Sequence, residues 1–127
     1  MNGPYGMESK EIAERAFRFG CRIVKLYENL LKKGGAARAL APQILDSGTS
    51  IGANLEEAAA GQTKPDFIAK VCISRKEARE TVYWLRLFVE SGLSLRSEVE
   101  WELDEAEQLV RILTAIIITA RSSTRRG

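Results

Sequence analysis

Residues 46–61 read DSGTSIGANLEEAAAG, a run in which small side chains outnumber all others. Apolar and small residues within it recur at helical spacing. Gly48 and Gly52 lie one turn apart, although a glycine in a helix interior costs up to about 1 kcal/mol relative to alanine. The two glycines therefore predict a thin helix that another backbone or side chain approaches closely, and this places the helix at the centre of the fold.

Asn54 is the polar residue on or beside the inward face of this predicted helix. A buried amide needs hydrogen-bond partners, because leaving it unpaired in an apolar environment is costly. We expect it to anchor a buried polar network with a side chain of the third helical pattern, the candidates being Glu77, Glu80 and Thr81. The alternative is an asparagine at the edge of the core that bonds to water.

Three further helical patterns flank the central one. Residues 8–33 carry apolar side chains every three or four positions, and the pattern stops at a pair of glycines. Residues 64–91 follow Thr63, which is suited to cap a helix, and residues 98–121 follow Ser97, which is suited to the same role. The sequence thus predicts four helices, and no alternating run typical of a strand competes with them.

Pro42 restricts where the central helix can begin. Proline has no backbone N–H to donate and is tolerated best in the first turn of a helix. The apolar pattern alone would allow a start near Ala37. We therefore expect the helix to begin nearer Ala41 and to end near Ala60.

The composition fits one compact domain. The chain has 127 residues, of which 45% are hydrophobic, and a formal net charge of only +2. Cys21 and Cys72 lack metal-ligand spacing and suggest reduced, buried thiols in a cytoplasmic protein. No apolar run approaches the roughly 20 residues of a membrane span. We predict an all-α, antiparallel up-down four-helix bundle at residues 8–121, between a disordered tail at 1–7 and a basic tail at 122–127.

Catalytic chemistry finds little support in the sequence. The chain has no histidine, which removes the commonest general base and a common metal ligand. Glu-x-x-His pairs, which hold di-iron centres in four-helix bundles, are therefore absent, and no glycine-rich phosphate loop follows a strand. We expect no enzymatic activity, no cofactor and no metal site.

A basic stripe on the first predicted helix is the stronger functional signal. Its members are Arg15, Arg18, Arg22 and Lys25, which lie within about 80° of one another on a helix and could follow a phosphate backbone. The alternative is an ordinary solvated surface, because Glu11 and Glu14 precede Arg15 and Arg18 by four residues. Arg22 has no such partner on its own helix. The third helix adds Lys64, Lys70, Arg75, Lys76 and Arg79, diluted by Asp66, Glu77 and Glu80.

Apolar residues also fall outside the inward stripe that one bundle can bury. A helix in a bundle needs an apolar stripe of roughly 100°, and three of these helices exceed it. A monomer rarely exposes a contiguous apolar patch beyond a few hundred Å², so we expect a closed homo-oligomer. The candidate interface residues are Phe17, Val24, Ile73, Trp84, Leu87 and Ile118.

SGTSIGANLEEAAAG followed by DFIAKVCISRKEARETVYWLRLFVESG resembles the bacterial four-helix-bundle family encoded in intervening sequences of large-subunit ribosomal RNA genes. The resemblance implies a cytoplasmic homo-pentamer with no established enzyme activity. That family also resembles the accessory protein of diversity-generating retroelements, a basic pentamer that binds reverse transcriptase and nucleic acid. Nucleic acid or a reverse-transcriptase-like protein is therefore an expected partner.

Three functional hypotheses follow for the chain. The first is a non-enzymatic oligomeric accessory protein that binds nucleic acid, or a protein that processes it, through basic faces. The second is a protein-interaction scaffold with no nucleic-acid role, whose charge serves solubility. The third, a small-molecule or catalytic bundle, requires a polar pocket around Asn54 and Glu77.

Overall fold

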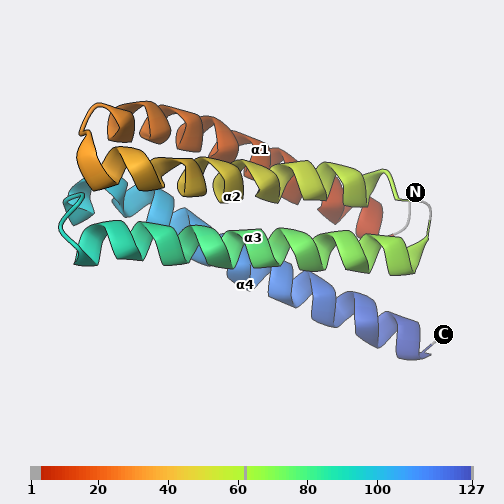
Figure 1. Cartoon of the computed structure of the whole chain (residues 1–127). Helices are drawn as coiled ribbons and strands as arrows, with labels where there is room; N and C mark the ends of the chain where they lie inside the picture. The colour runs from red at the N-terminus through yellow and green to blue at the C-terminus, as the bar shows by residue number, and fades with distance from the viewer. Residues whose placement is uncertain (1–3, 62, 127) are drawn as a thin grey trace.

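The computed structural model describes residues 4–61 and 63–126, with side chains for 10–61 and 63–123. Over these residues the chain forms four helices and no strand (Figure 1). Successive helices run in opposite directions and are joined by short connections. The predicted antiparallel four-helix bundle is confirmed, and its helices are α1 Pro4–Leu31, α2 Gly35–Ala59, α3 Lys64–Glu90 and α4 Arg96–Arg126.

Two outer helix ends lie beyond their predicted positions. α1 begins at Pro4, inside the predicted tail, because the fixed φ of proline suits the first helical position. α4 continues to Arg126, through most of the predicted basic tail. Its last turns are held against α3, where Lys64 Nζ donates to Ser123 Oγ at 3.3 Å. Residues 1–3 and 127 of the two predicted tails lie outside the described residues.

The prediction for Pro42 was wrong. α2 begins at Gly35, so Pro42 lies well inside the helix, where a proline costs on the order of 3 kcal/mol. Packing offsets this cost, because Ala37 and Ala41 on the same early turns are buried. A tight reversal before the helix, with Gly34 at a φ of 69°, brings those turns against the bundle.

The remaining helix starts are capped by side chains. Thr63 Oγ1 accepts from the Asp66 backbone N–H at 3.2 Å, which confirms the predicted cap of α3. The predicted Ser97 cap was wrong, because α4 already begins at Arg96. Glu98 reaches back instead and accepts from the Leu95 N–H at 2.7 Å, as the third residue of a capping box does. This bond, with a second from Lys33, holds the pKa of Glu98 below its usual value.

α2 lies between α1 and α3, and small residues let its neighbours approach (Figure 1). A Cβ built on Gly52 would lie 3.3 Å from the backbone of Ala16, and one on Gly48 would lie 2.8 Å from two side-chain carbons of Ile23. Ser74 of α3 donates to the carbonyl of Ile51 at 2.8 Å. The central position predicted for the glycine-containing helix is confirmed.

α4 diverges from α1 toward its C-terminal end (Figure 1). The space between α1 and α4 is an open hollow of about 440 Å³ with Ile12, Ile112 and Ile116 in its wall. Within the described residues, no helix combines the length and apolar character that crossing a membrane requires.

The expectation that both cysteines are buried was wrong. Cys21 is exposed and Cys72 is half-buried.

Candidate nucleic-acid interface

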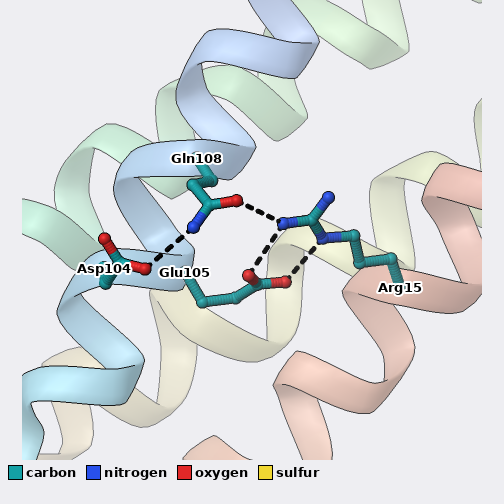
Figure 2. A network of polar contacts seen from close by, with 4 residues as sticks. All are labelled: Arg15, Asp104, Glu105 and Gln108. Carbon is teal, nitrogen blue, oxygen red and sulfur yellow. Dashed lines mark hydrogen bonds and ion pairs between the residues drawn. The ribbon is translucent and has the colours of Figure 1, made fainter.

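Arg15 of the basic stripe is held by α4 rather than by its own helix. Its guanidinium donates two bonds to the carboxylate of Glu105, at 2.7 and 2.9 Å, and one to Gln108 Oε1 at 2.9 Å (Figure 2). Gln108 in turn donates to Asp104 at 2.8 Å. The hydrogen bond to Glu105 raises the pKa of Arg15, which stays protonated. Arg15 is therefore a structural tie between α1 and α4.

Arg18 and Arg22 are also ion-paired. Arg18 Nη1 lies 3.4 Å from Glu14 on the same helix, and both side chains are exposed. Arg22 Nη2 lies 3.8 Å from Glu102, a buried carboxylate of α4, and its guanidinium stacks 4.2 Å above the ring of Trp101. The acidic partner that Arg22 lacks on α1 thus comes from α4.

Lys25, the fourth member of the basic stripe, is exposed. It is the one member for which none of the ion pairs found within the described residues supplies a carboxylate. The stripe predicted to bind phosphates is therefore largely neutralised by Glu14, Glu102 and Glu105. The structure tests no binding, so nucleic-acid contact through this stripe stays a prediction.

The polar network predicted around Asn54 has a different centre. Asn54 is half-buried and its Nδ2 donates to the Ser50 carbonyl of its own helix at 2.9 Å, not to α3. Ser47, two turns earlier in α2 and buried, meets Thr81 instead, whose Oγ1 lies 2.9 Å from Ser47 Oγ. The prediction placed the link to α3 two turns too late in α2, because the side chains at 47 and 81 both face the core.

Glu77 and Glu80 do not bond to Asn54 in the structure. Glu77 is half-buried, and burial followed by the charge of Glu80 and of Asp46 raises its pKa. Its backbone carbonyl accepts from Thr81 Oγ1 at 2.8 Å. Glu80 is exposed. Four hollows on the described surface are lined by neither Asn54 nor Glu77, so these hollows give no support to a pocket at that place.

The predicted interface residues lie on the outside of the bundle, and four of them are strongly exposed. Phe17 and Ile118 are each 59% exposed, whereas Trp84 and Leu87 are half-buried. Phe17 and Val24 flank a hollow of about 320 Å³ between α1 and α2, floored by Gly20, Gly52 and other small residues. The predicted excess of outer apolar side chains is present, including Val24 at 43% and Ile73 at 40% exposed.

A second group of cations lies on α3, and we call Arg75, Lys76 and Arg79 the α3 basic face. They line one open hollow of about 300 Å³ together with Cys72, Glu80 and Tyr83. Three cations face a single carboxylate there. None of the four ion pairs found among the described residues uses any of the three.

The positive surface continues from α3 onto α4. Arg79 shares a neighbouring hollow with Arg111 of α4, and Glu107 is the acidic residue in that wall. At the other end, Arg121 Nη2 donates to Cys72 Sγ at 3.6 Å, which places a further guanidinium beside the first hollow. Five cations from two helices therefore border the same outer surface.

Tyr83 is the aromatic residue of this surface. Its side chain is 58% exposed, and its ring meets Trp84 nearly at right angles, with centroids 5.1 Å apart. Arg75, Arg79 and Tyr83 follow one another at intervals of four residues, which on a helix is a rise of about 6 Å each. That spacing is the signal that sequence analysis passed over, because Glu77 was counted against these cations although it does not line their hollow.

Within residues 10–61 and 63–123 no group of three or more potential ligands could hold a metal ion. The described side chains thus offer cations, an exposed tyrosine and apolar outer surfaces.

Comparison with known proteins places the chain in a family. The model of the 23S rRNA-intervening sequence protein family matches residues 8–115. A crystal structure from Bacteroides thetaiotaomicron, of a protein with unknown function from the S23 ribosomal protein family, is 38% identical with a TM-score of 0.76. The match covers 84% of this chain and 97% of that chain. No curated protein matches. The resemblance seen in the sequence is confirmed, and the chain belongs to the 23S rRNA-intervening sequence protein family.

Proposed function

We propose that this chain is a non-enzymatic, self-assembling accessory protein that binds nucleic acid through the α3 basic face. The observation that carries the proposal is the set of three neighbouring cations without an ion-pair partner among the described residues. Lys and Arg that are not already paired can neutralise phosphates and release the counterions that surround them, which is the main source of sequence-independent affinity.

The α1 basic stripe is the weaker candidate for this role. Binding a phosphate with Arg15 would require breaking two bonds to Glu105, whose side chain is only 13% exposed. Arg22 would have to leave both Glu102 and the Trp101 ring. A carboxylate left buried without its cation is costly, so these arginines are poorly placed to exchange partners. The α3 basic face carries no such cost.

Self-assembly would make this modest charge effective. The net charge of +2 is too small for one subunit to bind strongly, but a closed ring presents the same face once per subunit. The exposed Phe17, Val24, Ile73 and Ile118 supply apolar surface for such contacts. We propose a homo-oligomer, with the pentamer favoured by the family resemblance.

A fluorescence anisotropy titration with a fragment of large-subunit ribosomal RNA tests the proposal. The variant Arg75→Gln/Lys76→Gln/Arg79→Gln should bind at least about tenfold more weakly, because a charge-assisted contact contributes roughly 1.5 kcal/mol or more. The matched control removes three α1 charges, as Arg18→Gln/Arg22→Gln/Lys25→Gln, and should change the affinity by about twofold or less. A larger loss in the α1 control than in the α3 variant would overturn the assignment.

The alternative is a protein-interaction scaffold without a nucleic-acid role. The hollow between α1 and α2 favours this alternative. Phe17 and Val24 flank the hollow, and Gly20 and other small residues line it, so a helix of a partner protein could pack there. Under this alternative the unmodified protein assembles, and RNA produces no anisotropy change at about 0.15 M salt.

A further inference from the structure

Tyr83 lies beside the α3 basic face and is exposed to solvent, although its ring is largely apolar. Tyr83 is 58% exposed, so much of its apolar surface is in water, where it contributes little to the core. Trp84 packs against the ring nearly at right angles and is itself half-buried. Trp84 therefore contacts the tyrosine on one side, while much of the residue stays exposed to solvent. The ring is therefore positioned as a platform rather than as a core residue.

The cations next to Tyr83 specify what kind of ligand such a platform would take. Arg75, Lys76 and Arg79 line the same hollow as Tyr83, and Arg121 approaches the hollow from α4. Proteins that bind single-stranded nucleic acid combine cations that track the backbone with aromatic rings on which bases stack. In a duplex each base face is covered by its neighbours, so stacking on a side chain requires an unpaired base.

We propose that this surface binds single-stranded nucleic acid, with one unpaired base stacked on Tyr83 and the adjoining phosphates on Arg75, Lys76 and Arg79. The inference rests on the proposed function and adds to it the strandedness of the ligand and the residue that recognises it. Trp101 is also an exposed aromatic beside a cation, but it is a poorer platform, because Arg22 already covers its ring at 4.2 Å.

The test compares two RNA probes of about 12 nucleotides, one single-stranded and one annealed into a duplex, a length within known site sizes. Tyr83→Ser should weaken binding of the single strand by about 5- to 150-fold, the effect of losing one stacked base, and should leave duplex binding unchanged. Tyr83→Phe keeps the ring and should retain the affinity. Trp101→Leu serves as the matched control and should also retain it.

Three results would overturn the inference. Equal single-strand affinity of Tyr83→Ser and the unmodified protein would show that no base stacks there. An equal loss for both probes would assign Tyr83 a role other than stacking, and a loss only in Trp101→Leu would move the platform to α4. Far-UV circular dichroism confirms that each variant is folded. If Arg75→Gln/Lys76→Gln/Arg79→Gln loses binding while Tyr83→Ser does not, the inference fails and the proposed function stands. If the unmodified protein binds neither RNA probe, both the inference and the proposed function are refuted.

Discussion

Gly48→Ala should destabilise the bundle, although alanine is the better helix former. The added Cβ would lie 2.8 Å from both Cγ1 and Cγ2 of Ile23, closer than real Cβ contacts come. Ile23 is fully buried and cannot yield toward solvent. Overpacking costs about 1 to 3 kcal/mol, and helix propensity returns up to about 1 kcal/mol. Because Ile23 has no room to move, the overpacking cost should fall in the upper part of that range, about 2 to 3 kcal/mol. The net loss is then about 1 to 2 kcal/mol, or roughly 4 to 8 °C in Tm.

The assay is equilibrium urea unfolding at one fixed protein concentration, because assembly would couple to stability. Gly20→Ala is the matched control: its Cβ would lie 3.9 Å from the nearest heavy atom, the Cα of Thr49, so it should gain up to about 1 kcal/mol. Adding Ile23→Ala to Gly48→Ala removes the clashing carbons, and the two changes together should cost less than their sum. Gly48→Ala at or above the stability of Gly20→Ala would refute the close approach of α1 to α2.

Three further predictions concern other contacts. Glu77→Gln should raise Tm at pH 7 but not below about pH 4, as thermal melts across this pH range will show. The pKa of Glu77 is higher in the folded than in the unfolded state, so ionising this carboxyl costs stability once the pH rises above the unfolded-state pKa. Arg15→Gln should lose on the order of 1 to 3 kcal/mol in urea unfolding by leaving Glu105 unpaired, and adding Glu105→Gln should recover most of it. Sedimentation of the unmodified protein at micromolar concentration should show one species larger than a dimer. Trp84→Glu or Ile118→Glu should split this species into smaller ones without loss of helicity. A monomer in the unmodified protein would contradict the assembly.

The fold was accessible from sequence because the signals for it are local and mutually consistent. The apolar period and the Thr63 cap each depend on neighbours within a few turns, and the structure confirms both. The close approach to Gly48 and Gly52 comes from another helix, but the glycines themselves mark it in the sequence, and the structure confirms it too. Pro42 was misjudged because tertiary packing overrides a local rule: buried alanines hold the start of α2. Ser97 was misjudged because another local cap takes its place: Glu98 accepts from the Leu95 N–H.

The site was less accessible because ion pairing is decided between helices. Periodicity put Arg15 and Arg22 on one polar face, but the rotation of α4 that brings Glu105 and Glu102 against them is a property of the packed bundle. Glu77 does not line the hollow of the α3 basic face either, so a count of charges along α3 understated its positive surface. Sequence therefore located the cations but could not tell the paired from the unpaired.

The salt dependence of RNA affinity tests most directly whether the α3 basic face contacts phosphates. For a single strand, each phosphate contact contributes about 0.7 to the slope of log affinity against log salt concentration. Removing three contacts with Arg75→Gln/Lys76→Gln/Arg79→Gln should therefore reduce the magnitude of that slope by about 2 relative to the unmodified protein. The same slope in both proteins would contradict the account.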